Sequence, residues 1–258
     1  MKLIKNPLTT SRRTKVAAAE DPSRPLLDHL TELRSRLLRC VAAVALLSVL
    51  GWFLSPSIIH QISRTVGPMV FLAPTEAFLV RLKLAVVLGF FLGAPVVITH
   101  AWRFIGVALT IPERRVVLGA LPFSYLLFVF GAALAWFVIV PAGLIFLLGF
   151  AAPGLRPTLS VEACVSFALW TSAGLGLLFQ LPVVIAALAS WGIVRSETLR
   201  RHRRHALVVI VIVAAVVTPG PDVFSQILLA APTYALYEIS IGLARALEPF
   251  RENHGGTT

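Results

Sequence analysis

Two acidic side chains stand just before long apolar segments, and their type and position suit cation binding better than catalysis. Glu32 lies in the run HLTELRSR and Glu113 in the run TIPERR. A carboxylate can accept a planar guanidinium through two parallel hydrogen bonds, a geometry that lysine does not copy. Each also has a structural explanation that stays open. Glu32 can pair with Arg36 one helical turn later, and Glu113 can complete a capping box with Thr110.

Gln180 is a polar side chain inside an apolar segment that is long enough to cross a membrane. A polar group in hydrocarbon needs a partner. Gln180 either hydrogen-bonds a neighbouring helix, or bonds the backbone freed by Pro182, or lines a polar cavity. The one further candidate of this kind is Glu238. A small-solute or ion transporter would carry ionisable residues in the middle of several spans, so this scarcity disfavours that class.

A proline-rich turn, Thr218-Pro219-Gly220-Pro221-Asp222, separates the last two apolar segments. Its two prolines lack a backbone donor and hold φ near one value. The sequence therefore predicts a rigid turn that sets the angle between the two flanking helices.

The apolar segments lack the groups that hydrolysis, metal binding or nucleotide binding would require. They contain no Asp pair, no Ser–His pair and no H-E-x-x-H, and the chain has no P-loop and no G-x-G-x-x-G. His202 and His205 lie inside an arginine cluster that repels cations, and Cys40 and Cys164 are expected near opposite membrane faces. We therefore expect no catalytic residue, no metal, no cofactor and no disulfide, and the protein is not expected to be an enzyme.

The composition indicates that lipid is the solvent for this chain. Of its 258 residues, 57% are hydrophobic and 14% are charged, whereas soluble domains carry about 25% charged residues. The net charge of +11 comes from short basic runs between apolar stretches, without interleaved aromatic residues for base stacking. Membrane topology explains these runs better than nucleic-acid binding does.

Six apolar segments are predicted to cross the membrane. They are Leu37–Leu54, Phe78–Ala101, Val116–Phe137, Val165–Trp191, Ala206–Val217 and Val223–Ala244. The fifth segment would reach only about 18 Å, against about 30 Å of hydrocarbon. The flanking segments are predicted as a basic cytoplasmic tail over 1–25 and a short tail over 251–258, with the membrane domain over 26–250.

Basic residues decide the orientation, because cytoplasmic loops carry an excess of lysine and arginine. With one span between 116 and 137, 19 of the 23 basic residues fall on one side, so both ends are predicted to be cytoplasmic. The alternative of two spans between 116 and 150 would put five arginines outside. We therefore expect 138–150 to form a helix at the outer surface, with external loops at 55–77 and 138–164.

Four motifs together resemble the TatC family, in family order and on the predicted sides. The run HLTELRSR resembles its N-terminal motif, and residues 94–115 (AP, WRF and PERR) resemble its first cytoplasmic loop. The runs FQLP, around Gln180, and TPGPDVFSQ, which ends at Gln226, resemble its fourth span and last external turn. The resemblance covers about residues 26–245.

The resemblance implies an all-α membrane protein with a concave bundle and two short final helices. It further implies a receptor for twin-arginine signal peptides of folded cargo, in a multimeric complex with the single-span proteins TatA and TatB. Glu32 and Glu113 would receive the signal arginines, and Arg34 and Phe104 would belong to the same surface. Gln180 would lie in the cavity, where a neutral amide does not suit a proton relay. The polar face that docks a partner helix would contain Thr218 and Gln226.

Overall fold

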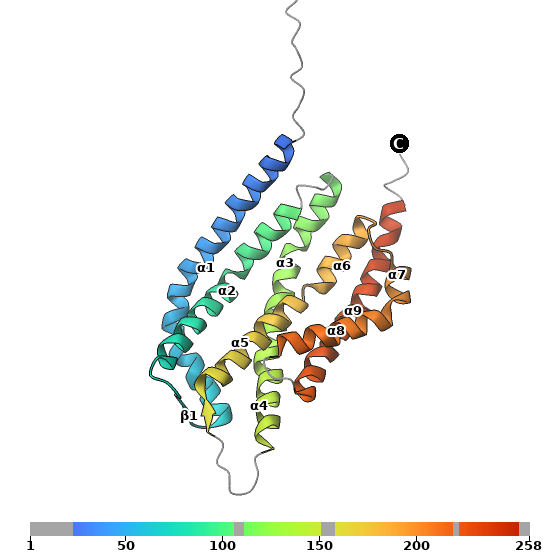
Figure 1. Cartoon of the computed structure of the whole chain (residues 1–258). Coiled ribbons are helices and arrows are strands. Elements are labelled where there is room, and N and C mark those ends of the chain that lie inside the picture. The colour runs from blue at the N-terminus through green and yellow to red at the C-terminus, as the bar shows by residue number, and fades with distance from the viewer. Residues whose placement is uncertain (1–22, 106–110, 151–157, 219–221, 253–258) are drawn as a thin grey trace, which may run out of the picture.

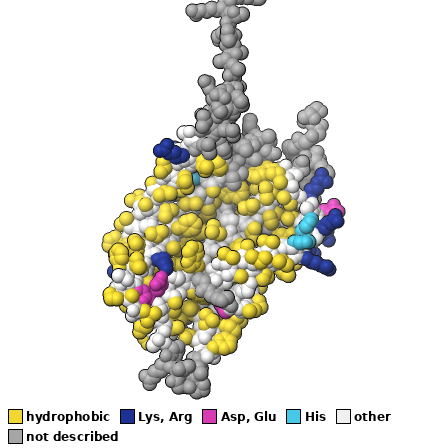
Figure 2. All heavy atoms as spheres, viewed as in Figure 1, with side chains coloured by type: hydrophobic (Ala, Val, Ile, Leu, Met, Phe, Trp, Pro, Cys, Tyr) yellow, Lys and Arg dark blue, Asp and Glu magenta, His cyan; other side chains and the backbone are white. Residues whose placement is uncertain are grey.

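The computed structural model describes residues 23–105, 111–150, 158–218 and 222–252, without the side chains of 23–30, 105, 111–118 and 247–252. The described part is a helical bundle with one two-stranded sheet (Figure 1). Five of its helical segments are long and apolar enough to cross a membrane. The face in Figure 2 is mostly hydrophobic, and charged side chains gather at a few places on it. An all-helical membrane protein is confirmed.

The first helix, α1, runs without interruption over Ser23–Val66, so the predicted external loop at 55–77 is wrong for its first twelve positions. Pro56 lies inside the helix and cannot donate to the carbonyl of Trp52, one turn earlier. The Ser55 hydroxyl donates to that carbonyl instead, at 2.8 Å. This local replacement explains why the proline does not end the helix.

The second helix, α2, spans Glu76–Ile105 and packs along α1. The two backbones approach closely at two glycines. A Cβ on Gly89 would lie 2.2 Å from the Ser48 hydroxyl oxygen, and one on Gly51 would lie 2.5 Å from the Ala85 carbonyl oxygen. A side chain at either position would push the two helices apart.

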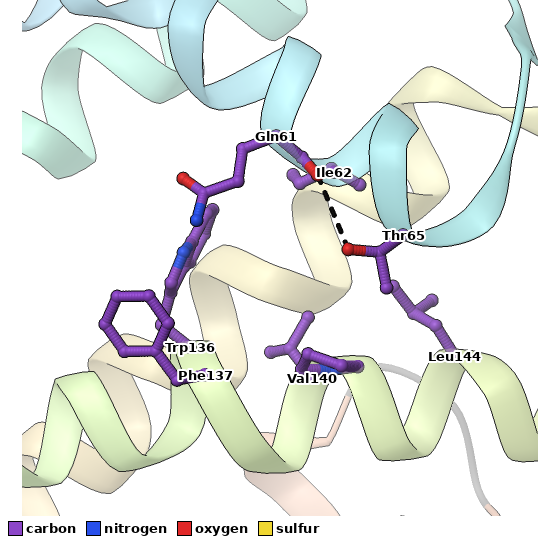
Figure 3. Close-up of a pocket in the computed structure, with 8 residues that line it drawn as sticks. Gln61, Ile62, Thr65, Trp136, Phe137, Val140 and Leu144 are labelled. Carbon is purple, nitrogen blue, oxygen red and sulfur yellow. Dashed lines mark hydrogen bonds between the residues drawn. The ribbon is translucent and has the colours of Figure 1, made fainter.

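The third candidate span lies in one helical run made of α3 (Ile111–Leu134), the π-helical turn η2 (Ala135–Ile139) and α4 (Val140–Leu148). Figure 1 shows α4 continuing the direction of α3. The alternative of two spans here is therefore wrong, and so is the expectation of a separate helix at the outer surface. Pro141 lies in the first turn of α4, directly after the π-helical turn, and the helical run continues through it. The wide turn η2 borders a pocket of about 130 Å³ against the end of α1 (Figure 3).

The fourth candidate span consists of α5 (Val161–Leu178) and α6 (Leu181–Ser190), separated by a turn at Phe179 and Gln180. After α7 (Ser196–Arg201) comes α8 (Arg203–Val217), whose 15 residues reach only about 22 Å. The last helix, α9 (Val223–Glu252), has 30 residues. The expectation of two short final helices is therefore right for α8 and wrong for α9, whose helical stretch continues past the apolar segment.

Two short strands join the loops at one end of the bundle. β1 (Met69–Val70) pairs in parallel with β2 (Leu159–Ser160). The apolar core beneath them includes Val80, Leu84, Val140, Leu144 and Val165. We call this end of the molecule, with β1, β2 and the first turn of α2, the strand end.

Candidate functional site

Glu32 lies near the start of α1. It forms an ion pair with Arg36, one helical turn later. The Glu32 side chain is 38% exposed and that of Arg36 is 17% exposed. Arg34 points elsewhere and is exposed. The pairing of Glu32 with Arg36 that the sequence left open is therefore present, yet the Glu32 carboxylate remains accessible. A cationic ligand would have to share or replace the guanidinium of Arg36.

The other two residues of the predicted receptor surface lie at the α2–α3 connection. Phe104 is half-buried near the end of α2. Glu113 lies in the first turn of α3, but its side chain and the proposed capping partner Thr110 are outside the described residues. In Figure 1 the start of α1, the end of α2 and the start of α3 all lie toward one end of the bundle, opposite the strand end. We call this the entry end.

Gln180 bonds to a neighbouring helix, which is one of the alternatives that the sequence left open. Its amide oxygen accepts from the Ser124 hydroxyl of α3, and its amide nitrogen donates to the Ser124 carbonyl at 2.9 Å. The Trp102 indole of α2 donates to the same hydroxyl at 3.3 Å. Ser124 is fully buried, so this group ties three helices together where α5 breaks into α6.

The turn between α8 and α9 is held by side chains on both of its flanks. Thr218 is buried and donates to the Ala214 carbonyl at 2.8 Å. Asp222 accepts from the Ser225 amide at 2.7 Å, which makes it the N-cap of α9. The Gln226 amide donates across to the Val211 carbonyl of α8 at 2.9 Å. The predicted turn residues Pro219 and Pro221 lie outside the described residues.

Sequence reasoning missed Glu76, which organises the strand end. This side chain is 5% exposed and accepts hydrogen bonds from the α1–α2 connection, from β2 and from the first turn of α5. Its Oε1 accepts from the Ser160 hydroxyl at 2.6 Å and from the Glu162 amide at 2.9 Å, while Oε2 accepts from the Leu72 amide at 2.5 Å. The sequence did contain a signal for this role, because Glu76 is a single acidic residue at the start of an apolar segment. A carboxylate in that position is stabilised by the amide donors at a helix N-terminus.

Within the described part of the chain, no group of three His, Cys, Asp or Glu side chains is placed to hold a metal ion. The polar groups described above bind backbone or one another. Their arrangement suits the binding and positioning of peptides or helices.

Comparison with known proteins gives one consistent result. The family described as Sec-independent protein translocase protein (TatC) matches residues 28–232, a range that contains every predicted site residue. The Sec-independent protein translocase protein TatC of Carboxydothermus hydrogenoformans is 36% identical over 234 residues, covering 89% of this chain and 96% of that relative. The protein of the same name from Escherichia coli (strain K12) is 35% identical over 232 residues, covering 87% and 90%.

The solved structures agree with the sequence relatives. A crystal structure of the twin arginine translocase receptor TatC matches with a TM-score of 0.75 at 32% identity, covering 85% of this chain and 99% of that one. A second crystal structure of that receptor, in DDM, gives a TM-score of 0.76. Both the sequence and the fold therefore lead to one conclusion, that this chain belongs to the TatC family of Sec-independent protein translocase proteins.

Proposed function

We propose that this chain is the signal-peptide receptor and core membrane subunit of a twin-arginine translocase. Such a translocase exports folded proteins across the bacterial cytoplasmic membrane with the proton-motive force. The observation that carries the proposal is the match of both sequence and fold to the twin arginine translocase receptor over most of the chain. The all-helical bundle, with five segments in its described part that can cross a membrane, suits this role.

The signal arginines bind at the entry end, where Glu32 and Glu113 each accept one guanidinium. Arg34 and Phe104 belong to the same surface and contact the residues around the arginine pair. The partial exposure of Glu32 and the shared position of three helix ends support this site. Arg36 already forms an ion pair with Glu32, so the signal arginine competes with this intrahelical partner.

The expected energies follow from this partial exposure. Hydrogen bonds to charged groups contribute about 1.5–3 kcal/mol when shielded, and an exposed ion pair contributes about 0–1 kcal/mol. Each glutamate should therefore supply roughly 1–2 kcal/mol, which is about a five- to thirtyfold change in affinity.

The test is the affinity of a twin-arginine peptide for wild type, Glu32→Gln, Glu113→Gln and the double variant. Glutamine keeps the size of the side chain and can still serve in a capping box, so folding and insertion should persist. Glu197→Gln is the matched control, because Glu197 is exposed at the start of α7. If Glu113→Gln binds the peptide like wild type, Glu113 is only a helix cap and the assignment at that position fails.

We propose that the chain crosses the membrane six times, with α8 as a short fifth crossing and both termini in the cytoplasm. Figure 1 supports an even number of crossings, because α1 starts and α9 ends toward the same end of the bundle. Labels placed at Arg12, Arg200 and His254 should react only from the cytoplasm, and a label at Arg156 only from outside. Reaction of Arg200 from outside would overturn this topology.

TatA and TatB-like single-span proteins dock near the turn between α8 and α9, and the assembly is multimeric. The surface beside this turn is apolar and exposed: Val216 is 80% exposed and Val223 is 67% exposed. Gln226 is half-buried at the edge of this surface, where it can meet a partner helix. Thr218 is buried, so it contributes by shaping the turn.

A further inference from the structure

A charged pair at the strand end lies beside an apolar groove, in a part of the molecule that the signal site does not use. The Lys83 ammonium of α2 donates to Glu162 Oε1 of α5 at 3.1 Å and to the Ser166 hydroxyl at 2.8 Å. The pair is not closed off, because the Lys83 side chain is 36% exposed and that of Glu162 is 52% exposed. Both charges therefore remain available to a ligand from the membrane.

The groove next to this pair has a volume of about 420 Å³. Besides the two charged residues it is lined by Leu79, Leu82, Val86 and Val87. These positions recur on one face of α2, within a segment that can cross a membrane. A hydrocarbon chain fits such a surface, and the charges at its edge fit a headgroup.

The two charges determine which lipid headgroup can bind at this site. An ammonium uses three donors, and two of those on Lys83 already have partners. Among the described residues, Glu162 Oε2 accepts no hydrogen bond, so it has room for a donor. A phosphate beside Lys83 would accept from its third donor, and a primary ammonium beside Glu162 would donate to Oε2. A purely anionic headgroup would satisfy Lys83 but leave Glu162 Oε2 without a donor, and the Glu162 carboxylate would repel it.

We propose that Lys83 and Glu162 form a binding site for a zwitterionic phospholipid whose headgroup carries a primary amine, with one acyl chain in the adjoining groove. Phosphatidylethanolamine has this chemistry. Phosphatidylcholine has the same charges but no ammonium proton to donate, and phosphatidylglycerol has no cation. The three lipids therefore separate hydrogen bonding to Glu162 from charge alone.

The test is native mass spectrometry of the full-length, delipidated protein in detergent, with the three lipids added at equal concentration and with identical acyl chains. Phosphatidylethanolamine should be retained about fivefold more than either of the others, since one partly exposed charged contact distinguishes them. Glu162→Gln should lower its retention to that of phosphatidylcholine. Lys83→Gln should lower the retention of phosphatidylethanolamine and phosphatidylglycerol together.

Arg81→Gln is the matched control, because it also removes one positive charge from α2. Arg81 faces α1: its guanidinium carbon lies 4.6 Å from the Trp52 ring centroid, and its Nε donates to Ser55 at 3.3 Å. Its loss should leave the lipid preference unchanged. Val86→Trp fills the groove without changing charge and should reduce the retention of all three lipids.

Two results on the wild-type protein would overturn the headgroup assignment, and a third, on Val86→Trp, would overturn the acyl-chain assignment. Equal retention of phosphatidylethanolamine and phosphatidylcholine would mean that Lys83 and Glu162 only join α2 to α5. Stronger retention of phosphatidylglycerol would mean that the site selects negative charge. An unchanged lipid load in Val86→Trp would remove the groove from the site.

Discussion

The two ends of the bundle are built in opposite ways. At the strand end, the buried carboxylate of Glu76 accepts from Leu72 of the α1–α2 connection and from Ser160 of β2, and β1 pairs with β2 beside it. At the entry end, Glu32 bonds within its own helix and keeps 38% of its side chain exposed. One end is therefore fixed by contacts between segments distant in sequence, while the other holds its charge by a contact within one turn.

This difference indicates that the strand end is rigid and that the entry end is the place to expect ligand binding. A buried carboxylate with several donors is costly to disturb, because every donor would be left without a partner. The Glu32–Arg36 pair lies within one helical turn and leaves the carboxylate 38% exposed, so a competing cation can reach it. The strand end therefore fixes the relative positions of α1, α2 and α5, and the entry end keeps a carboxylate available for an incoming guanidinium.

The largest effect is expected from breaking the strand end with Glu76→Ala. This change leaves the amides of Leu72 and Glu162 without their acceptor, so unfolding in detergent should become easier by about 3 kcal/mol. Thermal unfolding measures the loss, and proteolysis within the 67–75 loop should become faster. Glu197→Ala, at an exposed position, is the control. An equal effect of both changes would show that the strand end is not specially fixed.

A smaller effect is expected from Pro219→Ala combined with Pro221→Ala. Each alanine restores backbone freedom to the turn before α9, which costs about 0.4–1 kcal/mol at a position suited to proline. Docking of a single-span partner should weaken about fivefold, while twin-arginine peptide binding at the entry end should hold. Equal loss in both binding assays would mean that the turn does not act on docking alone.

The smallest effect is expected from Arg36→Gln, which sharpens the comparison at the entry end. The change frees Glu32 from an intrahelical pair worth about 0.2–0.5 kcal/mol, so peptide affinity should rise by up to about twofold. Arg39→Gln removes the same charge from an exposed position on the same helix. A rise of the same size in both variants would point to net charge and not to competition for Glu32.

Much of the fold was predictable because lipid imposes a simple rule on composition. The apolar stretches and the single candidate span between 116 and 150 followed from hydrophobicity and the distribution of arginine, whereas the turn at Phe179 and Gln180 inside the fourth apolar segment was not predicted. The partner of Gln180 was not predictable. It depends on Ser124, fifty-six positions earlier, which becomes a neighbour only when α3 packs against α5.

Two of the wrong predictions concern prolines that do not end a helix. Ser55-Pro56-Ser57 looked like the start of a loop, yet the Ser55 hydroxyl bonds the carbonyl that the proline leaves free. The stretch 138–150 looked like a separate surface helix, yet the helical run of α3 and η2 continues through Pro141 into α4. At Pro56 a local side-chain contact satisfies a carbonyl that the sequence pattern alone counted as unsatisfied.

The π-helical turn η2 determines where this helix can lose a residue without changing which side chains face the interior. Such a turn accommodates one more residue than an α-helical turn does, and each residue in an α-helix rotates the following face by about 100°. With this extra residue at 135–139, Ala135 and Ile139 face the interior and Gly143 still meets Ser225 and Phe167. Deletion of one residue here, such as the exposed Phe137, should convert η2 to an ordinary turn and preserve helical phase on both sides. The same deletion at Pro141 or Ala142 would turn Gly143 away from its neighbours, so a one-residue deletion in this helix should be tolerated within 135–139.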